Sequence, residues 1–219
     1  MRGSTPVRGE SRLPMALAVL ALMGFALIAP EHVTFFPGWL LAAIEGVLLL
    51  ILLIGDPGRI DRETPWLHWT SVLLVAVLLV SALGSTALLI LDLLDDSPVT
   101  AEAGPLLVAG AKVWLTNNIA FALLYWEFDD GGPVQRARGL PEHPDLAFPQ
   151  QMNPELAKPG WRPEFLDYLY VAFTTANAFS PTDTMPMTHW AKVAMASQAL
   201  ISFTIIGLVI ARAVNAFAS

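Results

Sequence analysis

A short polar turn near the C-terminus carries the side chains of this sequence that are best suited to handling an ion. The amide of Asn177 comes first, and hydroxyl and carboxylate oxygens follow at Ser180, Thr182 and Asp183. Rings of such groups around an axis can replace part of a cation's water shell. The turn therefore predicts an ion pathway or filter, whose candidate residues are Asn177, Ala178, Phe179, Ser180, Pro181, Thr182 and Asp183.

A second polar set lies inside two apolar segments. Glu45 and Lys112 each lie about nine residues, roughly 13 Å, into their own segment, and Asn117 and Asn118 follow Lys112. An isolated charge inside a bilayer costs about 2.5–3.5 kcal/mol on insertion scales, so such groups usually have partners. The equal depth predicts that Glu45 and Lys112 form an ion pair between neighbouring helices, with Asn117 close by. A small transport site at the same residues is the alternative.

Three elements within residues 163–217 must position the polar turn. Residues 164–178 predict a short amphipathic helix of roughly 22 Å, which is too short to span a bilayer easily. Pro181 cannot continue that helix, because proline lacks the N–H group and crowds the preceding turn. From Met187 the chain is apolar for about 28 residues, which is enough to cross. These are the parts of a re-entrant pore loop, with Gly207 as a candidate gate or hinge in the last helix.

The stretch from Asp167 to Pro186 resembles the pore loop of tetrameric potassium channels. In that family an Asp-x-Leu-Tyr opening leads to a Thr-rich helix end, a five-residue filter, an Asp and, three residues later, a Pro. The matching positions are Asp167, Leu169, Tyr170, Phe173, Thr175, Asp183 and Pro186. The helix that follows is also similar, in residues 199–201 and 207–212. The resemblance implies a homotetramer in which the helix 187–217 lines a central pore.

The filter itself departs from that family. Where the family has TVGYG, this chain has Ala178, Phe179, Ser180, Pro181 and Thr182. The family's glycines let the backbone turn its carbonyl groups toward the ion, whereas Ser180 and Thr182 resist such φ values and Pro181 fixes its own. The sequence therefore predicts weak selectivity among monovalent cations instead of a preference for potassium.

The composition narrows the function classes. Of the 219 residues 55% are hydrophobic and only 14% are charged, which indicates an integral membrane α-protein. Cysteine is absent, so disulfides and thiol chemistry are excluded. The histidines are scattered, at His32, His68, His143 and His189. With no catalytic, phosphate-binding or nucleic-acid motif, we expect no enzyme activity, no cofactor, no metal centre and no nucleic-acid partner.

The apolar runs predict an all-α membrane protein with five transmembrane helices and a re-entrant pore helix and loop between the fourth and fifth. The predicted spans are residues 13–30, 36–54, 66–94, 103–127 and 187–217. The chain divides into a polar N-terminal tail (1–12), a four-helix membrane portion (13–127), an extramembrane linker (128–162) and a pore-loop and inner-helix module (163–219).

The orientation in the membrane rests on two conflicting arguments. Five crossings put ten of the 12 Lys and Arg residues on the N-terminal side and leave Arg212 on the other, which favours a cytoplasmic N-terminus. That arrangement puts the pore loop on the cytoplasmic face. The resemblance to potassium channels implies the opposite orientation, with Arg212 in the cytoplasm.

The sequence thus predicts a homotetrameric pore-loop channel in a lipid bilayer, expected to be the inner membrane of a bacterium. No helix carries arginine at every third residue, so no voltage sensor is expected. The alternative is a non-conducting membrane protein or a small transporter, in which residues 164–186 form an interfacial helix and turn.

Overall fold

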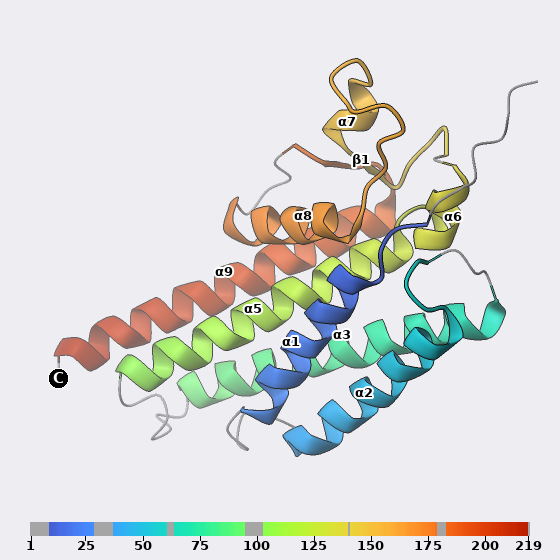
Figure 1. Ribbon diagram of the computed structural model, residues 1–219. Coiled ribbons are helices and arrows are strands. Elements are labelled where there is room, and N and C mark those ends of the chain that lie inside the picture. The colour runs from blue at the N-terminus through green and yellow to red at the C-terminus, as the bar shows by residue number, and fades with distance from the viewer. Residues whose placement is uncertain are drawn as a thin grey trace, which may run out of the picture.

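The structure is a computed structural model that describes residues 9–28, 37–60, 64–94, 103–139, 141–178 and 183–218 (Figure 1). Its helices form one bundle, and short elements gather over one end of it.

Four helices are long and apolar enough to cross a membrane. They are α2 (Gly38–Gly55), α3 (Pro65–Leu94), α5 (Ala103–Phe128) and α9 (His189–Ala218). Their bounds lie within about two residues of the predicted spans, because proline, glycine or charged residues flank each apolar run. These helices indicate an integral membrane protein.

The first helix, α1 (Leu13–Leu27), is shorter than a membrane span. Its 15 residues are about 22 Å long, whereas a bilayer core is about 30 Å thick. Residues 29 and 30, which were expected to complete this helix, lie outside the described residues. Five crossings therefore stay a prediction, with four helices of spanning length in the described part of the chain.

Contacts at the helix ends define the direction of each helix. Arg12 before α1 pairs with Asp56 after α2, with 3.0 Å between Nη2 and Oδ2. Ser71 in the first turns of α3 bonds Glu127 near the end of α5. The rings of Phe128 and Trp190 lie 6.3 Å apart, which brings the end of α5 to the start of α9. We call this end of the bundle, where α1, α3 and α9 begin and α2 and α5 end, the polar end.

The short helix α8 (Phe165–Ala178) begins at the polar end and packs against both α5 and α9. Its first turn is fixed by Asp167, whose Oδ2 accepts a hydrogen bond of 2.8 Å from the backbone N–H of Glu164. A carboxylate at this position also compensates the positive end of the helix dipole. In Figure 1 α8 lies beside α9, on the side of the bundle that the short elements cover.

The segment predicted to be an extramembrane linker contains short regular elements. The 3₁₀ turn η2 (Asp129–Gly131) and α6 (Pro133–Arg138) follow α5 directly, and α7 (Pro149–Met152) follows β1 (Leu146–Ala147). Both helices have proline in the first turn, where its missing N–H costs nothing. Their short lengths leave no apolar period that a sequence reading could detect.

The strands bring the chain after α8 back to the polar end. β2 (Met185–Pro186) pairs antiparallel with β1, so that Leu146 faces Pro186 and Ala147 faces Met185. The backbone N–H of Met187 then donates to the carbonyl of Asp145 at 2.8 Å. The chain therefore leaves the polar end through α8 and is back at the polar end before α9 begins.

The core has two parts that meet along α5. The larger lies toward the polar end and centres on Phe121, Tyr125 and Trp126 of α5. The smaller lies at the opposite end, where α5 and α9 approach so closely that a Cβ on Gly110 would lie 2.8 Å from a methyl carbon of Val209. Glycine is thus required at position 110 for the contact between the two helices.

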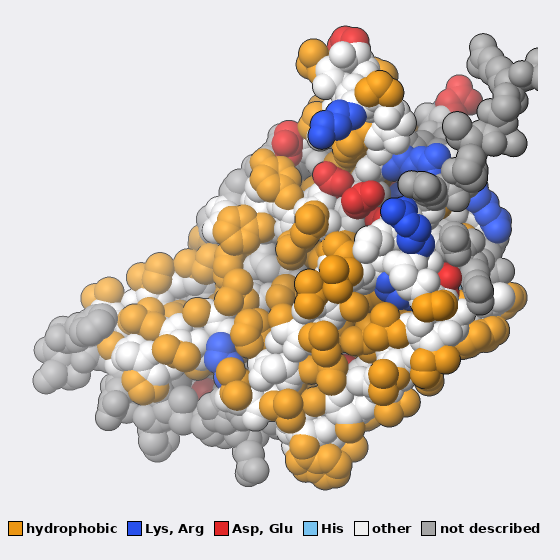
Figure 2. All heavy atoms as spheres, in the orientation of Figure 1, with side chains coloured by type: hydrophobic (Ala, Val, Ile, Leu, Met, Phe, Trp, Pro, Cys, Tyr) orange, Lys and Arg blue, Asp and Glu red, His pale blue; other side chains and the backbone are white. Residues whose placement is uncertain are grey.

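Hydrophobic and charged side chains occupy different parts of the molecular surface. On the face shown in Figure 2, hydrophobic side chains cover the helices, while most charged side chains gather over the short elements at the polar end. The exposed apolar residues include Trp39, Leu73, Val80, Leu200 and Phe203. This separation is expected of helices that face lipid and of a polar end that faces water.

Candidate functional site

The side chain of Gln198 in α9 links α8 to both α5 and α9. Its Oε1 accepts a hydrogen bond of 2.7 Å from the hydroxyl of Tyr125 in α5. Its Nε2 donates to the backbone carbonyl of Ala172 in α8 at 2.8 Å. Tyr125, Gln198 and Ala172 are fully buried. One amide therefore fixes three helices at a single point, which we call the Gln198 junction.

Aromatic contacts fix the course of α8 along α5. The rings of Phe165 and Trp126 lie 6.2 Å apart at the polar end, and those of Phe173 and Trp114 lie 5.5 Å apart farther along. Both pairs meet edge to face, an arrangement that aromatic quadrupoles favour. α8 therefore runs antiparallel to α5, with its C-terminal end away from the polar end.

Three buried oxygens near the Gln198 junction have no hydrogen-bond partner among the described residues. They are Oδ1 of Asn118 in α5, Oγ1 of Thr175 in α8 and Oγ of Ser202 in α9. All three residues are at most 2% exposed, and each lies within about two helical turns of the junction. Buried polar atoms nearly always have a partner, so each of these oxygens is a position where a water molecule or a cation can bind.

The predicted filter is described only at its two ends. Asn177 donates from Nδ2 to the carbonyl of Phe173 at 2.8 Å and lines a shallow depression beside Gly110 and Trp114. Ala178 ends α8, and Asp183 is exposed where the described chain resumes. The four residues between them, Phe179, Ser180, Pro181 and Thr182, lie outside the described residues, so the filter stays a prediction.

The predicted hinge at Gly207 lies in an unbroken helix. α9 continues through this position from His189 to Ala218, and a Cβ on Gly207 would meet no atom within 4 Å. The open space leaves room for another helix or for lipid at this face. The hinge role of Gly207 stays a prediction.

The expected ion pair between Glu45 and Lys112 is wrong. Nζ of Lys112 donates instead to the backbone carbonyl of Ile28, just after α1, at 2.9 Å. Glu45 is 2% exposed, and its Oε2 has no hydrogen-bond partner among the described residues. The physical reason is the packing order, because α1 contacts both α2 and α5 and supplies the carbonyl that Lys112 reaches.

The two asparagines that follow Lys112 donate hydrogen bonds to different helices. Asn117 donates from Nδ2 to Oγ1 of Thr86 at 2.6 Å and so ties α5 to α3. Asn118 donates to the carbonyl of Trp114, one turn earlier in its own helix, at 2.9 Å. The Nδ2 groups of both asparagines are therefore bonded, and Oδ1 of Asn117, like that of Asn118, has no hydrogen-bond partner among the described residues.

The polar end contains buried charges that the sequence did not reveal as a group. Arg12 and Asp56 form a buried ion pair, and Arg136 is buried with its Nη1 donating to the carbonyl of Asp129 at 2.5 Å. The indole N–H of Trp126 donates to Glu10. Burial raises the pKa of the Glu10 carboxyl from its ordinary value near 4.5 to about 7. In the sequence these charged residues lie directly beside the ends of apolar runs, and that position could have indicated that they meet at one end of the bundle.

Glu127 joins this group from the end of α5. Its Oε2 accepts a hydrogen bond of 2.5 Å from the hydroxyl of Ser71, and its Oε1 lies 3.4 Å from Nδ1 of His68. The side chain of Glu127 is 2% exposed, whereas that of His68 is half-exposed. His68 therefore separates the buried carboxylate from the surroundings.

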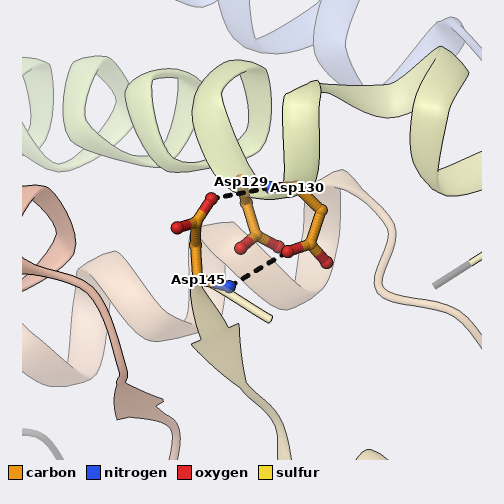
Figure 3. A group of neighbouring side chains, drawn as sticks. All are labelled: Asp129, Asp130 and Asp145. Atoms are coloured by element: carbon orange, nitrogen blue, oxygen red, sulfur yellow. Dashed lines mark hydrogen bonds between the residues drawn. The ribbon is translucent and has the colours of Figure 1, made fainter. Parts of the chain in front are cut away.

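Three aspartates could hold a metal ion by their spacing, since ligand atoms of Asp129, Asp130 and Asp145 lie within 4.8 Å of one another (Figure 3). Several of their oxygens already accept hydrogen bonds from the chain, whereas Oδ2 of Asp130 has no partner among the described residues. The carboxylates of Asp130 and Asp145 accept from each other's backbone N–H at 3.0 and 3.1 Å. Asp129 accepts from the N–H of Leu146 and from the hydroxyl of Tyr168. The group therefore fastens η2 to β1 and α8.

Comparisons with protein-family profiles, with curated proteins and with solved structures found no match for the chain.

Proposed function

We propose that the chain is one subunit of a pore-loop channel that conducts monovalent cations through a homotetramer. The observation that carries this proposal is the path of the chain around α8. It leaves the polar end as a helix of 14 residues, and seven residues after Ala178 it is paired with Leu146 and Ala147 at the same end. A helix of about 21 Å with such a return fits a re-entrant segment between the fourth and fifth crossings.

The end of α8 offers the chemistry that a cation needs. The last carbonyl groups of a helix carry a partial negative charge, equivalent to about half an elementary charge. In this proposal they point toward the pathway, and residues 177–183 supply the side-chain oxygens of its narrowest part. The buried oxygens of Asn118, Thr175 and Ser202 have no hydrogen-bond partner among the described residues, and in this proposal they add to the attraction for positive charge.

A four-fold assembly is part of the proposal because one re-entrant segment cannot enclose a water-filled path. Leu166 and Tyr170 are exposed on α8, and Leu200 is exposed on α9. These side chains are available to neighbouring subunits as well as to lipid. The absence of filter glycines supports weak discrimination between sodium and potassium.

A flux assay on the purified protein in liposomes tests this proposal. We expect sodium and potassium to dissipate a gradient at similar rates and chloride to be excluded, and cross-linking in the membrane to stop at four subunits. A strictly monomeric protein, or liposomes as tight as empty ones, would rule the channel out.

Transport by a single subunit is the second candidate function. It is favoured by the oxygens of Asn118, Thr175 and Ser202, which are buried within one chain and have no hydrogen-bond partner among its described residues. A transporter binds its ion at such an interior site and does not need four copies. Saturable flux through a monomer, lost in Ser202→Ala with Thr175→Val, would support transport. Flux that rises linearly with ion concentration through a tetramer would support the channel.

A further inference from the structure

A cavity at the polar end lies outside the proposed pathway. It has a volume of about 480 Å³ and lies between the first turns of α3, the end of α5 and α6. Its polar lining includes Arg12, His68, Ser71 and Glu127, and Trp69 contributes to its apolar wall. Cavities of this size commonly hold small molecules, with a few polar groups that orient the ligand.

The carboxylate of Glu127 is the principal polar group in the cavity. Oε2 of Glu127 already accepts a hydrogen bond from the hydroxyl of Ser71. Oε1 lies 3.4 Å from Nδ1 of His68, which is longer than a charge-assisted hydrogen bond. No lysine or arginine forms an ion pair with Glu127 in the described part of the chain. Oε1 can therefore accept from a further donor.

The neighbouring charges do not supply that donor. Arg12 is paired with Asp56, and Arg136 donates to the backbone of Asp129. Among the described buried residues of the polar end, the three acids Asp56, Glu127 and Asp129 face only two arginines. Glu127 is the one of these acids that lines the cavity. Its ion-pair partner among the described residues is the half-exposed imidazole of His68, and Arg12 and Arg136 act on it only at a distance. A ligand with one positive charge, or a proton, would balance this carboxylate.

The other walls suit a small organic cation. The indole rings of Trp69 and Trp126 line the cavity, and aromatic faces attract ammonium groups. Arg12 and Thr64 also line the cavity, and the buried Nε of Arg12 and Oγ1 of Thr64 have no hydrogen-bond partner among the described residues. Both groups can donate a hydrogen bond to an oxygen of the ligand that lies a short distance from its positive charge.

We propose that this cavity binds a primary ammonium group, which donates hydrogen bonds to Oε1 of Glu127 while an adjacent oxygen of the ligand meets Arg12 and Thr64. An ethanolamine unit has this arrangement. It could come from a free amine or from the headgroup of a lipid, since Trp69 is 68% exposed at the rim of the bundle. The proposal is independent of ion conduction.

Titration calorimetry on the full chain in detergent tests the proposal, with ethanolamine as the probe and ethylene glycol as its neutral counterpart. We expect the wild type to bind ethanolamine at least about tenfold more tightly than ethylene glycol. Glu127→Gln should remove that preference. Glu155→Gln removes an exposed acid of the linker, one that does not line the cavity, and should keep the preference.

Equal affinity for the two probes in the wild type would overturn the proposal without reference to any variant, and would indicate that a proton neutralises Glu127. A preference that survives in Glu127→Gln would also overturn it. Nanodiscs then identify the source of the group. Weaker ethanolamine binding in phosphatidylethanolamine than in phosphatidylcholine indicates the lipid headgroup, and equal binding indicates a soluble amine.

Discussion

The hydroxyl of Tyr125 donates a hydrogen bond of 2.7 Å to Oε1 of Gln198, and neither residue is exposed. Because the same amide also bonds the backbone of Ala172, this pair holds α8 in place between α5 and α9. The proposed pathway begins at the far end of α8, so its geometry depends on this junction.

Loss of the Gln198 junction should destabilise the bundle. Gln198→Leu leaves the buried Tyr125 hydroxyl without its acceptor, and we expect a loss of about 1–3 kcal/mol in unfolding free energy. Tyr125→Phe removes the donor and should cost less. The double variant should lose less than the sum of the single losses, because both act on one bond. Thermal unfolding in detergent measures the cycle, and Thr204→Val, a change on α9 at a partly exposed hydroxyl, is the control. Strictly additive losses would contradict the junction.

The helices themselves could be predicted from the sequence, because each apolar run ends at proline, glycine or charge. Gly55 and Asp56 end α2, and Pro65 begins α3 close to where they were expected. The short α8 could also be predicted, since Asp167 lies in its first turn and Pro181 prevents its continuation.

The contacts between helices could not be predicted in the same way. Arg12 meets Asp56 across 44 positions, and Ser71 meets Glu127 across 56. Lys112 reaches a backbone carbonyl at Ile28, a partner that no side-chain pattern reveals. Depth along a helix can be counted from its sequence, but which helices are neighbours depends on packing.

The stability of the polar end should depend on the protonation of Glu10. Its pKa is about 7 in the folded chain and near 4.5 when exposed, so between these values the folded state binds more protons than the unfolded state. Unfolding free energy therefore falls as pH rises from about 4.5 to 7, by at most about 3 kcal/mol from this group. Thermal unfolding at several pH values should show a shallower fall in Glu10→Gln than in the wild type. Parallel curves would contradict this assignment.

Glu45 and Lys112 should act independently. Lys112→Met removes a bond to the carbonyl of Ile28, and Glu45→Gln changes a buried acid elsewhere. Since the two side chains share no bond, the double variant should lose the sum of the single losses within about 0.5 kcal/mol. A thermal unfolding cycle in detergent measures this. A coupling well above that limit would restore the ion pair that the structure lacks.

Replacement of Asp183 should weaken the preference for cations. A tetramer of Asp183→Asn subunits would lack the ring of four negative charges at the mouth of the proposed pathway. We expect the ratio of sodium to chloride permeability to fall several-fold, while Glu155→Gln, an exposed acid of the linker, leaves the ratio unchanged. If both variants behave alike, Asp183 lies outside the pathway.

The reversal potential of single-channel currents, recorded from the purified protein in a planar bilayer, tests cation conduction most directly. Under a tenfold gradient of potassium chloride, the account predicts a reversal potential close to that of potassium, and only a small shift when sodium replaces potassium on one side. Absence of current, or reversal near the chloride potential, would contradict the proposal that this chain forms a cation pore.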